Sequence, residues 1–90
     1  MSHSNTAASQ IEAGNWLRAL RLSWRITRME LAEQTGFGTA EIVAGIEAGQ
    51  VRLPRAAYAA FARVFALDAA SFAASCDAYY AVAEKIRSAA

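Results

Sequence analysis

The stretch TRMELAEQTGFGTAEIVAGIEAG, residues 27–49, contains two short helix-forming segments separated by a glycine-rich turn. Thr27 and Glu30 match a capping box, in which the threonine hydroxyl accepts from the third backbone N–H of the helix and the glutamate accepts from the threonine N–H. Gly36 is typical of a left-handed helix end. We therefore predict one helix over about residues 28–35, a turn over residues 36–38, and a second helix between the N-cap Thr39 and Gly49. Ile42 and Ile46 lie one turn apart in this second helix and are expected to face inward.

A further helix is predicted before this stretch. It should begin near Gln10 or Asn15 and end near Trp24, because Leu17, Leu20 and Trp24 recur at helical spacing and give it one apolar face. Residues 1–9 are polar and are expected to form a disordered tail.

Two more helices are predicted after the stretch. Pro54 suits the first position of a helix that runs to about Ala66, with Tyr58, Phe61 and Phe65 on its apolar face.

Asp68 is then the expected N-cap of a last helix, which begins at Ala69 or Ser71 and ends near Ser88. Its apolar seam has two interpretations. It packs back onto the first helix, or it forms a homodimer interface, and both can hold at once. The residues of this seam are Phe72, Cys76, Tyr79, Tyr80, Ala83 and Ile86.

Composition favours an all-α fold. The 90 residues include 23 alanines and a single proline, and the pattern predicts no strand. The length allows one hydrophobic core. We divide the chain into the tail (1–9), a domain over residues 10–68, and a C-terminal helix over residues 69–90.

The charge balance is close to neutral, with nine basic and eight acidic residues. A protein that holds nucleic acid through phosphate neutralisation is usually more basic, although a local basic face matters more than the total. The densest basic run is Arg18, Arg21, Arg25 and Arg28, which forms either an electrostatic footprint or a solvated helix face.

Several classes of function are not expected. The single Cys76 excludes an internal disulfide and fits a reducing compartment. The one histidine, His3, lies in the tail, so no catalytic pair or zinc site is expected, and no cofactor or enzymatic activity is expected either. The N-terminus lacks a signal-peptide pattern, and the apolar tract 56–75 is interrupted by Arg63 and Asp68, so a cytoplasmic, non-membrane protein is predicted.

Two short helices joined by a glycine turn within a five-helix chain suggest a helix-turn-helix. Residues 17–68 further resemble the XRE-type family of lambda repressor and Cro. The residues that carry this resemblance are Thr27, Leu31-Ala32, Gly36, Ile46-Glu47-Ala48-Gly49, Phe61-Ala62 and Leu67-Asp68. The resemblance implies a five-helix lambda-repressor-like fold with an extended C-terminal helix, and a transcription regulator such as a repressor.

The same resemblance implies a site on duplex DNA. The second helix of the unit would lie in the major groove, and the starts of both helices would approach phosphates. Carried over, Thr27 and Arg28 would contact phosphates or base edges. The residues expected to face the bases are Thr39, Ala40, Glu41 and Ala44, and those expected to follow the DNA backbone are Gln50, Arg52 and Arg55.

A second hypothesis is that the protein has the same fold but does not bind DNA. The near-neutral charge, the aromatic seam and a recognition helix without Arg, Lys, Asn or Gln favour a protein-binding module, such as an antiactivator that sequesters another regulator. An antitoxin that binds both DNA and a toxin would combine the two activities.

Overall fold

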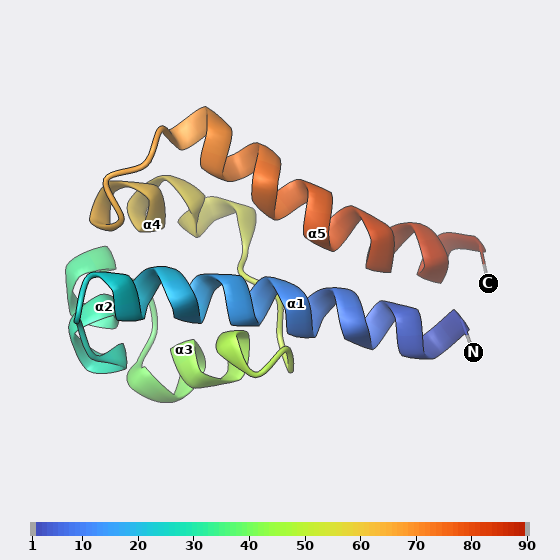
Figure 1. Cartoon of the computed structure of the whole chain (residues 1–90), viewed down its shortest axis with the longest axis horizontal. Helices are drawn as coiled ribbons and strands as arrows, with labels where there is room; N and C mark the ends of the chain where they lie inside the picture. The colour runs from blue at the N-terminus through green and yellow to red at the C-terminus, as the bar shows by residue number, and fades with distance from the viewer. Residues whose placement is uncertain (1, 90) are drawn as a thin grey trace.

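The computed structural model describes the backbone of residues 2–89 and the side chains of residues 9–81. Within these residues the chain is all-helical and has no strand. Two long helices, α1 and α5, run antiparallel and side by side, while the short helices pack against the half of the molecule where α1 ends (Figure 1). The elements are α1 (Ser2–Ser23), α2 (Arg28–Thr35), α3 (Ala40–Glu47), the 3-10 turn η1 (Arg55–Ala57), α4 (Tyr58–Val64) and α5 (Ala69–Ala89).

The start of α2 is the predicted capping box. The Thr27 hydroxyl accepts from the Glu30 N–H at 3.0 Å, and the Glu30 carboxylate accepts from the Thr27 N–H at 2.7 Å. Gly36 ends the helix with a φ of 69°, a left-handed conformation that glycine adopts without steric cost. The predicted bounds of α2 are confirmed.

Two later helices, α3 and α5, also begin at caps. Thr39 accepts from the Ile42 N–H at 3.3 Å at the start of α3, and Asp68 accepts from the Ser71 N–H at 2.9 Å at the start of α5. The helix predicted after Pro54 differs in detail, because it opens with a 3-10 turn and ends at Val64.

We expected a tail over residues 1–9, whereas α1 of the structure already begins at Ser2. The sequence from Ser2 to Ala13 contains neither glycine nor proline, so nothing in it stops a helix that continues backward from the packed part of α1.

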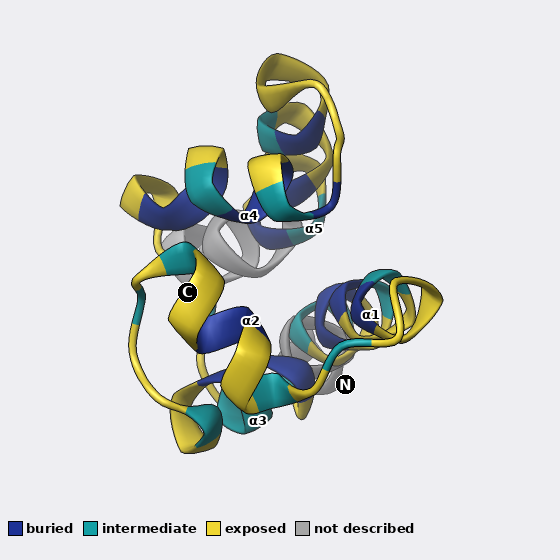
Figure 2. Ribbon diagram, turned by 90° about the vertical axis from the view of Figure 1, so that its left-hand side faces the viewer, coloured by how far each residue is buried: buried dark blue, intermediate teal, exposed yellow. Residues whose placement is uncertain are grey.

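Each helix contributes at least one nearly inaccessible side chain to a single core, and the buried faces point inward between the helices (Figure 2). Examples are Leu17 of α1, Leu31 of α2, Ile46 of α3, Phe61 of α4 and Phe72 of α5. The helices therefore bury one apolar face each, as the predicted amphipathic pattern implies.

Two side chains that were expected to face inward are instead exposed. Trp24 follows the end of α1 and is 51% exposed, and Ile42 is 43% exposed because Val43 takes the inward position beside Ile46. In an eight-residue helix, several rotations satisfy the same apolar spacing, and only packing selects one.

Within the described residues, the seam of α5 packs onto the core of the same chain. Phe72, Cys76 and Tyr80 are each at most 2% exposed, and Trp16 of α1 stacks on Phe72 with ring centroids 5.3 Å apart. These three side chains therefore form no exposed dimerisation surface, which corrects that interpretation for them. Tyr79 is half-buried, also against Trp16. The side chains of Ala83 and Ile86 lie outside the described residues.

Candidate nucleic-acid interface

The first turns of α2 and α3 border an open cleft of about 480 Å³. Five of the nine predicted DNA-contacting residues line it, namely Thr27, Arg28, Ala40, Glu41 and Ala44. Arg21 and Met29 complete the lining and were not predicted. Thr39, the N-cap of α3, is exposed immediately before Ala40. The structure thus brings together the residues at the two helix starts.

A buried glutamate pairs with both arginines that line the cleft. Glu47, the last residue of α3, has a side chain only 3% exposed and accepts two hydrogen bonds from Arg21 of α1, at 2.7 Å and 3.1 Å. Arg21 also donates to the backbone oxygen of Ile26 at 2.9 Å. Removing a carboxylate from water is costly unless it is paired and hydrogen-bonded, and this bidentate contact satisfies both needs.

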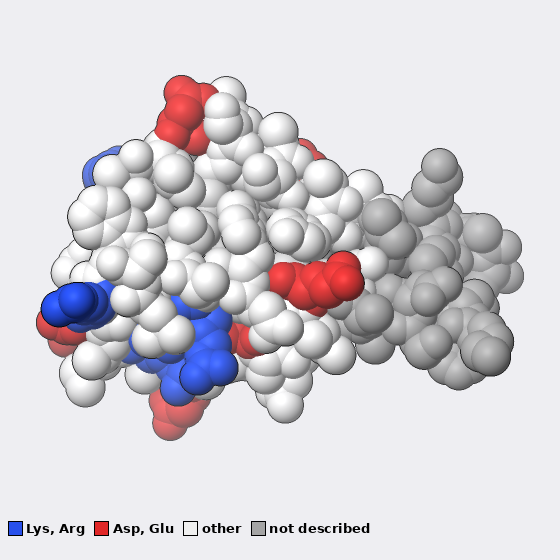
Figure 3. Space-filling view, viewed as in Figure 1, with Lys and Arg blue, Asp and Glu red and all other residues white. Residues whose placement is uncertain are grey.

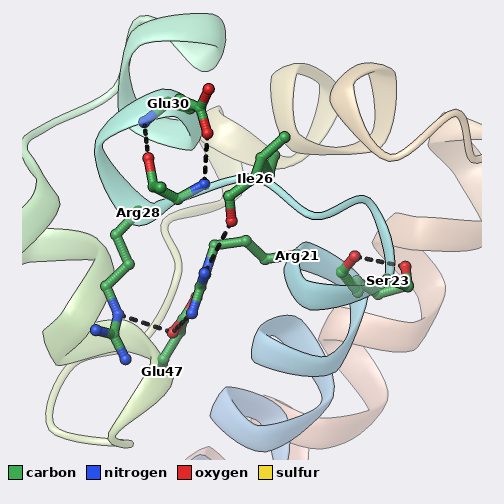
Figure 4. Close-up of polar contacts among 8 residues, drawn as sticks. Arg21, Ser23, Ile26, Arg28, Glu30 and Glu47 are labelled. Carbon is green, nitrogen blue, oxygen red and sulfur yellow. Dashed lines mark hydrogen bonds and ion pairs between the residues drawn. The ribbon is translucent and has the colours of Figure 1, made fainter.

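Glu47 also orients Arg28. The Nε of Arg28 donates to Glu47 Oε1 at 3.0 Å, while the Arg28 side chain remains 41% exposed. In Figure 4 the two terminal nitrogens of Arg28 point away from the glutamate. Within the described part of the chain they make no hydrogen bond, so a ligand oxygen in the cleft can accept from a guanidinium that is already held in place.

The outward arc of α3 carries small and apolar side chains around one carboxylate. Val43, Ile46 and Glu47 face the core, whereas Glu41 and Ile42 are exposed. The remaining outward positions are Ala40, Ala44, Gly45 and Ala48. This arc offers methyl groups and hydrogen-bond acceptors, but no side-chain donor.

On its other side, α3 borders a second groove of about 470 Å³. This groove is mainly apolar, and Val51 at its edge is 48% exposed. Gln50 and Arg52, which were predicted to contact DNA, line this groove and not the cleft. The other lining residues are Phe37, Glu41, Ile42, Gly45, Ile46 and Pro54.

Arg52 and Arg55 attach the loop before α4 to helix α5. Arg52 donates to the Tyr58 hydroxyl and lies over the Tyr80 ring, 4.3 Å from its centroid. The Tyr58 hydroxyl in turn donates to Asp77 at 3.0 Å, and Arg55 pairs with the same carboxylate at 3.5 Å. Burial, together with the hydrogen bond to Asp77, raises the pKa of Tyr58, so this hydroxyl remains a donor at physiological pH.

Cys76 lies next to Asp77 and is buried. Burial is the main reason that the pKa of this thiol rises to about 12. The thiol is therefore protonated at neutral pH and packs as a small apolar group.

Sequence reasoning missed the pairing of Arg21 with Glu47. A signal did exist, because Val43, Ile46 and Glu47 share one helix face at spacings of three and four residues. A glutamate on an otherwise apolar face needs a cationic partner, but the sequence does not say which of the nearby arginines supplies it.

The surface charge is mixed. On the face shown in Figure 3, basic side chains gather close to acidic ones at one end of the molecule, and most of the visible surface is uncharged. Among the described residues no three potential ligands cluster to hold a metal ion. None of the helices searched combines the length and the apolar character that a membrane span needs.

Comparison with protein-family models, with curated proteins and with solved structures found no match to this chain.

Proposed function

We propose that the α2–turn–α3 unit is a lambda-repressor-like helix-turn-helix and that the chain is a sequence-specific DNA-binding transcriptional regulator. In this proposal α3 lies in the major groove. The major groove of DNA is about 12 Å wide and admits an α-helix, whose diameter with its side chains is about 10–12 Å.

The observation that carries the proposal is the arrangement of Arg28. Its Nε is bound by the buried Glu47, and its terminal nitrogens face outward beside the cleft. Arginine forms strong, directional hydrogen bonds to phosphate oxygens, and an arginine held in place loses less side-chain entropy when it binds. Arg28 would therefore fix the protein on the DNA backbone while α3 faces the bases.

The test is fluorescence anisotropy of a labelled duplex at several salt concentrations. Arg28→Ala should weaken binding to all sequences and reduce the slope of log affinity against log salt by about one. Arg63→Ala is the matched control, because Arg63 is exposed on α4 and lies outside the cleft.

Circular dichroism confirms that both variants fold. If Arg28→Ala binds with wild-type affinity and an unchanged salt slope, the assigned role of Arg28 is wrong. If the wild type binds no duplex at low salt, the proposed function itself is wrong.

The second groove favours another candidate function, a protein-binding module. Its exposed Ile42 and Val51 suit the apolar face of an amphipathic helix from a partner regulator. Two results together would favour this candidate over DNA binding. The wild-type protein captures such a regulator but retains no DNA, and Val51→Ser no longer captures the regulator.

A further inference from the structure

We infer that α3 reads cytosine amino groups and thymine methyl groups, so that its preferred half-sites carry a cytosine next to a thymine on the strand that it faces. This inference rests on the proposed DNA-binding function and adds the chemical class of base that the site recognises.

Glu41 supplies the first part of the selectivity. It is exposed in the first turn of α3 and lines the cleft beside Arg28. A carboxylate only accepts hydrogen bonds at neutral pH. In the major groove, guanine presents two acceptors, thymine presents an acceptor and a methyl group, and adenine presents its amino donor next to an acceptor. Cytosine is the only base whose own major-groove edge carries a donor and no acceptor, so Glu41 favours cytosine.

The apolar side chains next to Glu41 supply the second part. Ile42 is 43% exposed, and Ala44 lines the cleft one turn after Ala40. Such groups contact the thymine methyl favourably and offer nothing to the polar edge of guanine. Ala40, Ala44 and Gly45 are small, so at these three positions the α3 backbone can approach the bases closely.

The opposite charges of Glu41 and Arg28 make the affinity for DNA depend on the base sequence. Glu41 is repelled by phosphates, whereas Arg28 is attracted to them, so the pair contributes little net attraction to an arbitrary duplex. The cytosine amino group offsets the repulsion only at the correct site. Specificity therefore arises partly from weak binding elsewhere, which agrees with the near-neutral charge of the chain.

The experiment is a selection of random duplexes with the whole chain at low salt, followed by affinity measurements on the enriched site. The enriched half-site should contain adjacent cytosine and thymine. Replacing that thymine by uracil, which removes one methyl group, should weaken binding about threefold to fivefold. Glu41→Gln should shift the preference from cytosine to adenine, because a glutamine amide pairs with both the amino group and N7 of adenine.

Glu33→Gln is the matched control, because Glu33 is an exposed glutamate of α2 that does not line the cleft. It removes the same charge and should leave the base preference unchanged. Two results would overturn this inference and leave the proposed function intact. In the first, the chain binds DNA but its affinity does not fall when uracil replaces thymine. In the second, Glu41→Gln binds DNA with the same base preference as the wild type. Absence of any duplex binding would overturn both.

Discussion

Two arginine–carboxylate networks hold this small protein together, and they differ in burial. In the first, the Glu47 side chain is 3% exposed and joins α1, α2 and α3 through Arg21 and Arg28. In the second, the Asp77 side chain is 51% exposed and joins α5 to Arg55 of η1 and to the Tyr58 hydroxyl at the start of α4.

The comparison shows that burial decides what a charge pair can do. An exposed pair contributes little because water screens it, whereas removing one partner of a buried pair leaves an uncompensated charge. The buried network therefore fixes the relative positions of α1, α2 and α3 and orients Arg28 at the candidate site. The exposed network links η1 and the start of α4 to α5.

Removing the two carboxylates should give the largest difference between the networks. Glu47→Ala should lower the free energy of unfolding by about 3–5 kcal/mol, because Arg21 is left charged and buried. Asp77→Ala should cost about 1 kcal/mol, since it removes an exposed ion pair and one hydrogen bond. Urea denaturation measures both.

A loss of about 3–5 kcal/mol can unfold a domain of this size. The double variant Arg21→Met with Glu47→Leu addresses this, because it removes both buried charges and should recover most of the stability. Equal losses for Glu47→Ala and Asp77→Ala would contradict the distinction between the networks.

Two glycines in helices that the buried network joins, Gly14 of α1 and Gly45 of α3, should give the next largest effect. A Cβ at Gly14 of α1 would lie 2.3 Å from the backbone oxygen of Glu47, so Gly14→Ala must push α1 and α3 apart, at a cost of about 1–3 kcal/mol. At Gly45 the nearest atom would be 3.6 Å away, an ordinary contact, so Gly45→Ala should raise stability by up to about 1 kcal/mol.

Thermal unfolding of the two alanine variants provides the measurement. The expected outcome is a lower melting temperature for Gly14→Ala and a higher one for Gly45→Ala. Unchanged stability in Gly14→Ala would show that α1 and α3 do not approach as closely as described.

The smallest effect concerns the exposed cap of α5, which lies outside both networks. The hydrogen bond from the Ser71 N–H lowers the pKa of Asp68 below its usual value. The cap therefore stabilises the fold fully above the unfolded-state pKa, about 3.9, and this contribution is lost as the pH falls through the lower folded-state pKa. Wild type and Asp68→Ala should differ in stability at pH 6 and converge towards pH 3, as denaturation at each pH would show. A difference that is constant with pH would contradict this role.

The local features of the fold could be predicted from the sequence. Capping depends on residues only three apart, so Thr27, Glu30, Thr39 and Asp68 could be assigned without tertiary information. The rotation of short helices about their axes could not be predicted in this way. Ile42 was expected to face inward, although Val43 occupies that position.

The candidate site was predictable only in part. The residues at the two helix starts lie together because the turn between them is short, as the sequence indicates. The partners of the arginines are distant in sequence, since Glu47 lies 26 residues from Arg21 and Asp77 lies 22 residues from Arg55. No local pattern specifies such pairs, so the resemblance-based roles of Arg52 and Arg55 could not anticipate their contacts with Tyr58 and Asp77.

The most direct measurement of the central claim is an NMR titration of the isotope-labelled chain with a short duplex at low salt. The account predicts that amide shifts change most at the two helix starts, residues 27–29 and 39–44, and that these changes fade as salt is added. Changes confined to the loop at residues 50–54 or to α5, or none at all, would contradict it.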